Sequence, residues 1–511
     1  MAGAYPVSTF NLVSSLQKIT PAARKPLILA QGTTSGSFTT GALVSEVSSG
    51  LTAGNDLCGA GSIGALMINA FKQVAPNVTL AAIIVSDNGS GVAATGSVVA
   101  GASTPTAGTF YLTVGSYTKS RYAITTTTSS TATTIGDDIE SAITGDLNSP
   151  ITASNSSGTV TLTAKNKGTE GNNIGLRVES LPSGVTCALT ALTSGATDPS
   201  LTGVLAKIDT LRYDIISPVA FLADIKTHLE AKFNVSNAIL DGVGFVCKTA
   251  TYANAQTALA PATLASKVIT YLNNKIVADS DWKGASELEL DYVISAYIAA
   301  IRALRFKSNA SISQYMQSPN NRGGAFLAGI PYHNMKLVNL AILPAEKAFS
   351  LTEIQGLAEL GGSTLSPDES GTVTVTNPLW MTAYKLDTPT ADGWTYKNMN
   401  KSDCATTARE YIFRNLKNYY AQSALTQGDD PNNPLIRVAT EKGIRAYIVG
   451  LWQDLSGPDY AVLQGSATLL QEFQENLVVN VDTTIGSVSG SMSFNLMGQL
   501  ETFDFDLTPN L

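Results

Sequence analysis

The sequence predicts a multidomain α/β protein that carries a smaller, inserted β-rich domain. At 511 residues the chain is longer than a single hydrophobic core usually supports. Apolar runs of strand length alternate with helix-spaced segments on both sides of residues 89–197, which is the pattern of α/β layers. Within residues 89–197 the composition changes abruptly to Ser, Thr, Gly and Ala, which indicates a separate module.

The first α/β elements are a strand, a helix and a second strand. Pro26–Ala30 is a short apolar run, which is typical of a buried strand. Ile63–Gln73 has apolar residues at helical spacing, and Val78–Val85 is a continuous β-rich run. The polar stretch Ser48–Cys58 lies between these elements, and we expect it to be a loop.

Residues 89–197 carry their own strand signals. β-formers cluster or alternate at Phe110–Val114, Ser120–Thr127 and Thr159–Thr163, and Ile135–Leu147 has the length of one helix. A disordered linker is the alternative interpretation of such Ser/Thr richness. Disordered segments lack alternating β-branched apolar residues, so a folded β-rich domain is favoured.

Helical and strand patterns alternate again after residue 198. The expected helices are Leu205–Tyr213, Ala220–Phe233, Thr249–Ala258, Ser286–Arg305, Thr406–Tyr420 and Pro458–Val478. The expected strands are Ile215–Ile216, Gly244–Cys247, Val338–Leu343, Val373–Tyr384 and one or two strands within Met492–Leu507. The predicted divisions of the chain are residues 1–25, 26–88 together with 198–365, 89–197, 366–490 and 491–511.

The last segment places its apolar residues on two different faces. Phe494 and Leu496 share one parity, whereas Phe503 and Phe505 share the other, so the strand must bulge between them to keep one face apolar. An apolar strand at a chain end is an exposed edge, which soluble monomers avoid. We therefore expect another strand to pair with it.

The sharpest enzyme-like signal is the G-x-G-x-x-G run Gly59–Gly64, which opens a helix. A dinucleotide site needs a buried strand directly before the first glycine, and here the polar Ser48–Cys58 stands in that place. His228, beside Lys226 and Glu230, is expected on a solvated face, and His333 in a loop. Neither histidine has neighbours at metal-ligand spacing. The sequence thus predicts no enzyme, no cofactor and no metal.

Charge and hydropathy restrict the partners. The net charge is −8 and no basic run occurs, which opposes binding to nucleic acid. The apolar stretch Tyr292–Leu304 is too short to span a bilayer, so we expect no direct membrane insertion. Only 14% of residues are charged, and a largely neutral surface favours contacts with other proteins.

Several segments together resemble the Mu-type contractile tail sheath family. They follow one another along the chain in the expected order: Gly59–Phe71, Gly108–Val114, Thr159–Lys165, Asn166–Ile174, Ala408–Ile412, Ala439–Ile444 and the final strand. This resemblance covers nearly the whole chain. Two other classes stay open as alternatives, a dinucleotide-binding oxidoreductase using Gly59–Gly64 and a surface adhesin.

The resemblance implies a homo-oligomeric helical sheath of stacked rings, part of a virion and assembled in the host cytoplasm. The sheath surrounds a tail tube, is metastable when extended, and contracts to drive the tube through the host envelope without consuming a nucleotide. Its other partners are baseplate and tail terminator proteins. Residues 366–490 become an inner α+β domain, residues 26–88 with 198–365 a middle α/β domain, and residues 89–197 an outer domain.

The same resemblance implies a role for the chain ends, and a tube contact is added to it as a hypothesis. Both ends become arms that add strands to neighbouring subunits, with these residues at the contacts: Tyr5, Val7, Phe10, Phe494, Leu496, Phe503 and Phe505. The tube-facing candidates are cations on the helix Thr406–Tyr420, namely Arg409, Arg414 and Lys417. A solvated basic face is the alternative explanation of these three cations.

Overall fold

The computed structural model describes residues 25–496 except 117–118, 234, 236–237, 277–281, 284–288, 306–331, 333–334, 338–339, 341–347, 377–378, 384–396, 427–437 and 458–461. The described chain is mixed α/β with several separate sheets, which confirms the predicted class. It forms two compact units, one ending at Cys404 and one covering Ala405–Leu496. Each unit is described by itself.

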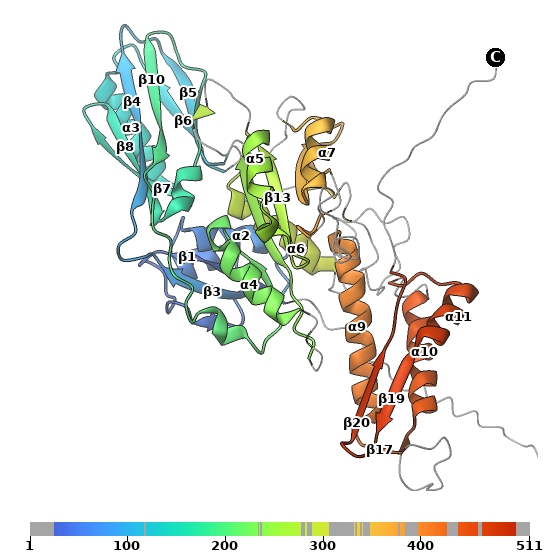
Figure 1. Ribbon diagram of the computed structural model, residues 1–511. Coiled ribbons are helices and arrows are strands. Elements are labelled where there is room, and N and C mark those ends of the chain that lie inside the picture. Colours follow the sequence, from blue (N-terminus) through green and yellow to red (C-terminus); the bar gives the residue numbers. More distant parts are fainter. Residues whose placement is uncertain are drawn as a thin grey trace, which may run out of the picture. The chain divides into compact units, whose positions relative to one another are not determined.

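The first unit is built on an eight-stranded sheet (Figure 1) in the order β16-β15-β13-β12-β11-β1-β3-β2. The strands are β1 (Pro26–Gly32), β2 (Leu43–Val44), β3 (Ala81–Ser86), β11 (Asp214–Ile216), β12 (Gly244–Ala250), β13 (Ile269–Lys275), β15 (Gly362–Pro367) and β16 (Val373–Val375). All neighbours from β15 to β3 are parallel, and β2 and β16 are antiparallel edges. The interior is therefore a parallel sheet of the α/β type.

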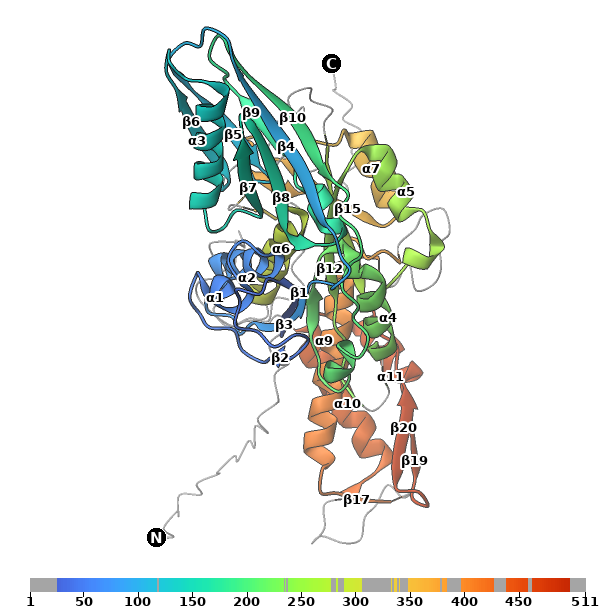
Figure 2. The ribbon, with the colours of Figure 1, turned by 90° about the vertical axis from the view of Figure 1, so that its left-hand side faces the viewer.

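Helices cover both faces of this sheet. They are α1 (Ala53–Cys58), α2 (Ile63–Val74), α4 (Leu222–Lys232), α5 (Tyr252–Leu259), α6 (Asp291–Arg305) and α7 (Leu351–Glu359). Ile28 of β1 belongs to the hydrophobic cluster with α2 and α6, and its neighbour Leu27 to the cluster with α4, α5 and α7. Figure 2 shows these two groups of helices on opposite sides of β12. Because both faces of the sheet are buried, the sequence of β1 is a continuous apolar run rather than an alternation of apolar and polar residues.

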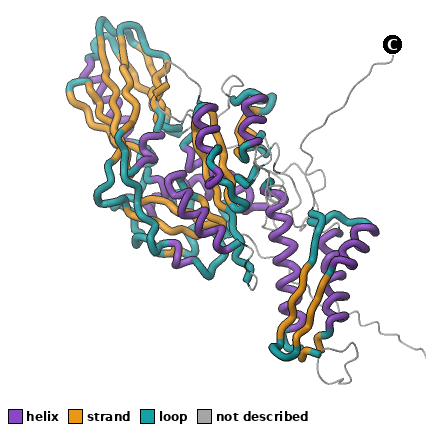
Figure 3. The backbone as a smooth tube through the Cα atoms, in the orientation of Figure 1, coloured by secondary structure: helices purple, strands orange, loops and turns teal. Residues whose placement is uncertain are grey.

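The insert contains two four-stranded antiparallel sheets, β10-β4-β8-β7 and β14-β9-β5-β6. Its elements are β4 (Ala93–Ala102), β5 (Gly108–Val114), β6 (Arg121–Thr126), α3 (Ala132–Gly145), β7 (Ile151–Ser156), β8 (Thr159–Lys167), β9 (Leu176–Glu179) and β10 (Val185–Thr193). The short β14 (Trp282–Lys283) comes from much later in the chain. Ile135, Ile139 and Ile143 of α3 are buried, and Figure 3 shows α3 as the helix among these strands. The segment is thus a folded β-rich module and not a disordered linker.

Three sequence expectations for the first unit need correction. Ser48–Cys58 is not wholly a loop, because Ala53–Cys58 forms α1, where the Gly54 amide donates to Asn69 Oδ1 at 3.0 Å. That tertiary bond outweighs the local turn preference. Instead of a helix over Leu205–Tyr213 there is one 3-10 turn, η2 (Leu205–Ile208), and the Ile208 carbonyl at its end accepts from Lys232 Nζ at 2.7 Å. The Val373–Tyr384 strand is reduced to β16, and the Val338–Leu343 strand lies outside the described residues apart from Leu340.

The second unit consists of helices beside a hairpin. Helix α9 (Met399–Tyr420) starts in the first unit and continues into the second. The rest comprises β17 (Ala424–Leu425), β18 (Val438–Ala439), α10 (Glu441–Ser456), α11 (Ala467–Asn476), β19 (Val478–Asp482) and β20 (Ser487–Ser491). The predicted helix Pro458–Val478 was too long, since β19 starts at its last residue. The hairpin of β19 and β20 was not predicted, because its second strand is rich in Ser and Gly and has no apolar face.

Candidate functional site

The glycine run Gly59–Gly64 opens helix α2, as the sequence predicts. Gly59 and Gly61 have φ values of 83° and 75°, which favour glycine, and the Ser62 side chain caps the helix by accepting from the Ala65 amide. The element before the run is helix α1, not a strand. A dinucleotide fingerprint would require a strand there.

The insert occupies the space in front of this helix start. Asn166 of β8 accepts a hydrogen bond from the Ile63 amide through Oδ1 at 2.9 Å. Lys165 Nζ donates to the Ala60 carbonyl at 3.1 Å, and a Cβ atom on Gly61 would lie 2.1 Å from the Ser149 carbonyl oxygen. At this helix start the Ile63 amide is bonded to the insert and the Ala65 amide to the Ser62 side chain, so neither is available to a pyrophosphate. These contacts remove the basis of the oxidoreductase alternative.

Further polar contacts fasten the insert to the eight-stranded sheet and to the turn before α4. Glu170 accepts from the Ala220 amide through Oε1 at 2.9 Å, and Asn173 accepts from Lys248 Nζ through Oδ1 at 2.6 Å. Burial raises the pKa of Glu170, while nearby Lys248 acts in the opposite direction. Because such groups are costly to leave unpaired, these bonds fix the insert in one position on the sheet.

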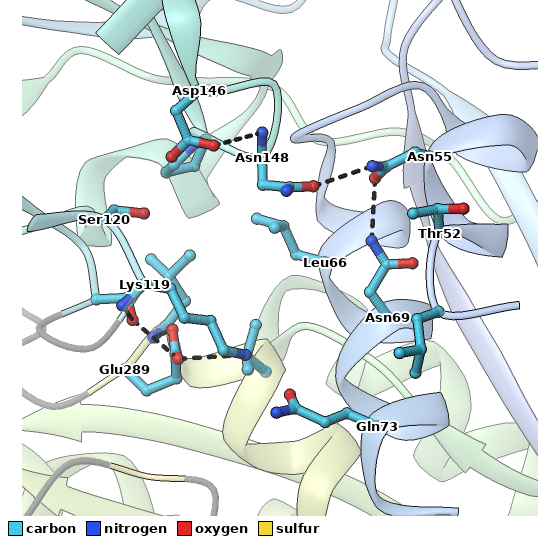
Figure 4. A pocket seen from close by; sticks show the side chains of 15 residues that line it. Thr52, Asn55, Leu66, Asn69, Gln73, Lys119, Ser120, Asp146, Asn148 and Glu289 are labelled. Carbon is cyan, nitrogen blue, oxygen red and sulfur yellow. Dashed lines mark hydrogen bonds and ion pairs between the residues drawn. The ribbon is translucent and has the colours of Figure 1, made fainter. Parts of the chain in front are cut away.

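A cavity of about 370 Å³ lies beside this junction, lined by side chains of α2, the insert and α6 (Figure 4). Its polar groups are bound to one another. Asn55 donates to Asn148 and accepts from Asn69, both at 3.0 Å, while Lys119 lies 3.7 Å from the Glu289 carboxylate. Ser116 Oγ also donates to Glu289 Oε2 at 2.9 Å. Within the described residues no group of three or more His, Cys, Asp or Glu could hold a metal ion.

Arg302 is a large charged side chain buried in the first unit, with only 1% of it exposed. Its guanidinium donates to Asp214 Oδ2 of β11 at 2.5 Å and to Asp403 Oδ1 of α9 at 2.6 Å. Tyr332 also donates to Asp403, at 2.7 Å. The two carboxylates raise the pKa of Arg302 against the effect of burial. This cluster ties α6, the sheet and the start of α9 together. The sequence signal was Arg302 interrupting the apolar stretch Tyr292–Leu304.

The three predicted tube-facing cations differ in their surroundings on α9. Arg414 is committed to an ion pair, because its Nε lies 3.0 Å from Oε1 of Glu410, whose side chain is only 2% exposed. Arg409 is half-buried and also has interactions, and Lys417 is exposed. On the same helix Ala408 and Ile412 are buried, while Leu416 and Tyr419 are half-buried. The ring of Tyr419 stacks on Tyr447 at 4.3 Å.

Two of the predicted arm residues lie within the described chain. Phe494 stacks on Phe473 at 5.8 Å, and Leu496 forms an antiparallel bridge with Leu463. Both contacts are made within the second unit. The other five lie outside the described residues: Tyr5, Val7, Phe10, Phe503 and Phe505. The arm role of all seven stays a prediction.

The histidines give one correction. His228 was expected on a solvated face, but its side chain is only 7% exposed and lies 3.4 Å from Asp209. Burial lowers its pKa to about 4, and Lys232 adds to the effect. His333 lies outside the described residues. None of the described helices is long and apolar enough to cross a membrane.

The chain is similar in sequence to a known tail sheath protein. No family model matches the chain. It is 29% identical over 210 residues to the Mu-like prophage FluMu tail sheath protein of Haemophilus influenzae, an alignment that covers 39% of this chain and 42% of the relative. That match confirms the resemblance to Mu-type sheath proteins. The alignment spans less than half the length of either chain.

Two solved structures are similar over almost the full length. The sheath tail protein of Desulfitobacterium hafniense is 11% identical, with a TM-score of 0.44 and 98% of each chain covered. The sheath tail protein Lin1278 of Listeria innocua is 12% identical, with a TM-score of 0.45 and coverage of 96% of this chain and 95% of the other.

Proposed function

We propose that this chain is the structural subunit of the contractile tail sheath of a bacteriophage. It polymerises around the tail tube in a metastable extended state and contracts to drive the tube through the host envelope. The similarity to a prophage tail sheath protein over 210 residues supports this role. The energy of contraction is stored in the packing of the lattice, so the subunit needs neither catalytic residues nor a cofactor.

The observation that carries this proposal is the hairpin of β19 and β20. Among the described residues these two strands pair only with each other, so the outer edge of each is open. Val478, Ile485 and Val488 are 44%, 74% and 45% exposed. A lone hairpin with open edges is marginally stable in water and readily accepts a further strand. We infer that residues 1–25 and 491–511 of neighbouring subunits supply those strands.

Phe494 and Leu496 then form the root of the C-terminal arm. Their contacts with Phe473 and Leu463 hold this root on its own unit, and the segment after Leu496 is the part that reaches a neighbour. In this scheme the second unit faces the tube, the eight-stranded sheet with its helices forms the middle domain, and residues 89–197 lie outside. Baseplate and terminator proteins bind the ends of the polymer, within the virion and, during assembly, in the host cytoplasm.

Electron microscopy of the purified full-length chain tests the function, since a sheath subunit forms tubes or short helical polymers. The matched variant ends at Leu496 and so keeps the contacts of Phe494 and Leu496 with its own unit. We expect it to be folded and soluble but unable to polymerise. Polymers of normal length from this truncated chain would contradict the arm model.

Lys417 gives the cleanest test of the tube contact, because Arg414 already neutralises buried Glu410 and its reversal would disturb the helix. We expect Lys417→Glu to weaken tube-dependent assembly, since it reverses the charge presented to an acidic tube surface. Lys442→Glu, at an exposed position of α10, is the control. Equal assembly of both variants on the tube would remove Lys417 from the contact.

A further inference from the structure

One face of the insert carries hydroxyl side chains in rows. In the sheet β10-β4-β8-β7 the inward positions, such as Val98, Val160 and Leu162, are buried. The register aligns the outward positions across all four strands. One row consists of Thr190, Ser97, Thr161 and Ser154. The next row consists of Thr193, Thr95, Thr163 and Thr152. These side chains are exposed or half-exposed in the described structure, and together they form the hydroxyl face.

The hydroxyl face carries no carboxylate on any of its four strands. Its two cations, Lys165 and Lys167, lie at one end of β8. Lys165 Nζ donates to the carbonyls of Ala60 and Leu147, and Lys167 Nζ donates to that of Gly89 at 3.5 Å. The positive charges are therefore turned toward the protein's own backbone, and the rest of the face is neutral.

The other surfaces of the insert are charged. On the second sheet Arg121 and Arg177 both pair with Glu179, at 3.2 and 3.4 Å. Helix α3 exposes Asp137 and Asp138. Since charged side chains are the ordinary means of keeping an exposed sheet from associating, their absence from this one face indicates a surface that contacts protein.

We propose that the hydroxyl face contacts a second copy of this chain in the assembled polymer, an inference that rests on the proposed sheath function. The chain has a net charge of −8, so copies repel one another wherever carboxylates face each other. A face without carboxylates is where two copies approach at the lowest electrostatic cost. Hydroxyl groups both donate and accept hydrogen bonds, so two such faces, or one face and a neutral polar surface, leave few groups unpaired.

The size of the face explains why it acts only within a polymer. With strands about 4.8 Å apart and outward residues about 6.8 Å apart along each strand, the two rows on four strands present roughly 260 Å². Two copies would then bury roughly 500 Å² in total, well below the usual range of stable specific interfaces. The contact thus adds to a lattice that other interfaces already hold, and it does not produce a dimer of free subunits.

The test introduces a negative charge in the centre of the face. Thr161→Glu should leave the far-UV spectrum unchanged but raise the critical concentration for polymerisation at least threefold. Thr161→Ser should behave as the unaltered chain, because it keeps the hydroxyl. The matched control is Thr125→Glu, an exposed threonine on the outward face of the other sheet, which should polymerise normally.

Each outcome separates this inference from the proposed function. If the unaltered chain forms tubes and Thr161→Glu forms them at the same concentration, the contact is wrong while the sheath function stands. If the unaltered chain forms no polymer at all, both are overturned. If Thr161→Glu polymerises normally but loses retention on a dextran or amylose column that binds the unaltered chain, the face binds a neutral polysaccharide instead.

Discussion

Replacing Arg302 tests how the first unit holds the start of helix α9. The guanidinium is 1% exposed and lies between Asp214 and Asp403, whose side chains are 6% and 1% exposed. Arg302→Met keeps much of the side-chain volume but leaves two carboxylates buried without their cation. Breaking a buried pair in this way typically costs about 3–5 kcal/mol. We therefore expect the free energy of unfolding, measured by urea denaturation of the full-length chain followed by circular dichroism, to fall by that amount.

Two further variants separate charge from packing. In Arg302→Met combined with Asp214→Asn and Asp403→Asn, no charge stays buried, and we expect about half or more of the lost stability to return. Lys226→Met is the control, because Lys226 pairs with Glu230 on the surface, 20% and 36% exposed, and should cost under about 1 kcal/mol. If Arg302→Met cost no more than this surface variant, the cluster would not hold α9 in the way described.

Three further predictions concern other parts of the first unit. Burial lowers the pKa of His228 to about 4 from 6.5, so the unfolded chain binds the extra proton between these values and stability falls as the pH drops through that window, by on the order of 2 kcal/mol. His228→Gln should flatten this part of the pH profile of urea unfolding, and an unchanged profile would exclude His228 as its cause. Asn166→Ala removes the acceptor of the Ile63 amide and should cost about 1–3 kcal/mol, with faster hydrogen exchange at Ile63; unchanged exchange there would show that this bond does not fasten the insert. Gly61→Ala should reduce the yield of folded protein far more than Gly89→Ala, because Gly61 has φ 75° and no room for a Cβ atom, whereas Gly89 has open space around it; equal yields would refute the close approach of the insert.

Much of the candidate site could not be read from local sequence. The glycine run Gly59–Gly64 was correctly identified as a helix start, but nothing near it showed that Asn166 would take the free amide, because that residue is 103 positions further along the chain. The same limit applies to Arg414. The sequence around Arg414 suggested a cation available to a partner protein. In the structure Arg414 pairs with Glu410, whose side chain is buried, so the charge of Arg414 is already neutralised.

The hairpin of β19 and β20 was missed for a different reason. Its second strand, Ser487–Ser491, has four of five residues exposed and therefore has no apolar periodicity to detect. Backbone pairing alone defines it, in register with Val478–Asp482. Backbone hydrogen bonds to its partner strand, and not burial of its side chains, define such a strand. Its open edge therefore could not be predicted from the sequence.

The sequence by itself predicted the α/β class and a separate β-rich stretch in residues 89–197. These properties follow from composition and from the period of apolar residues, both of which are local. Only the tertiary structure decided which polar groups meet: Arg302 with Asp214 and Asp403, the insert with the start of α2, and the aligned rows of the hydroxyl face. Those pairings depend on strand register and on contacts between distant segments, which local patterns do not encode.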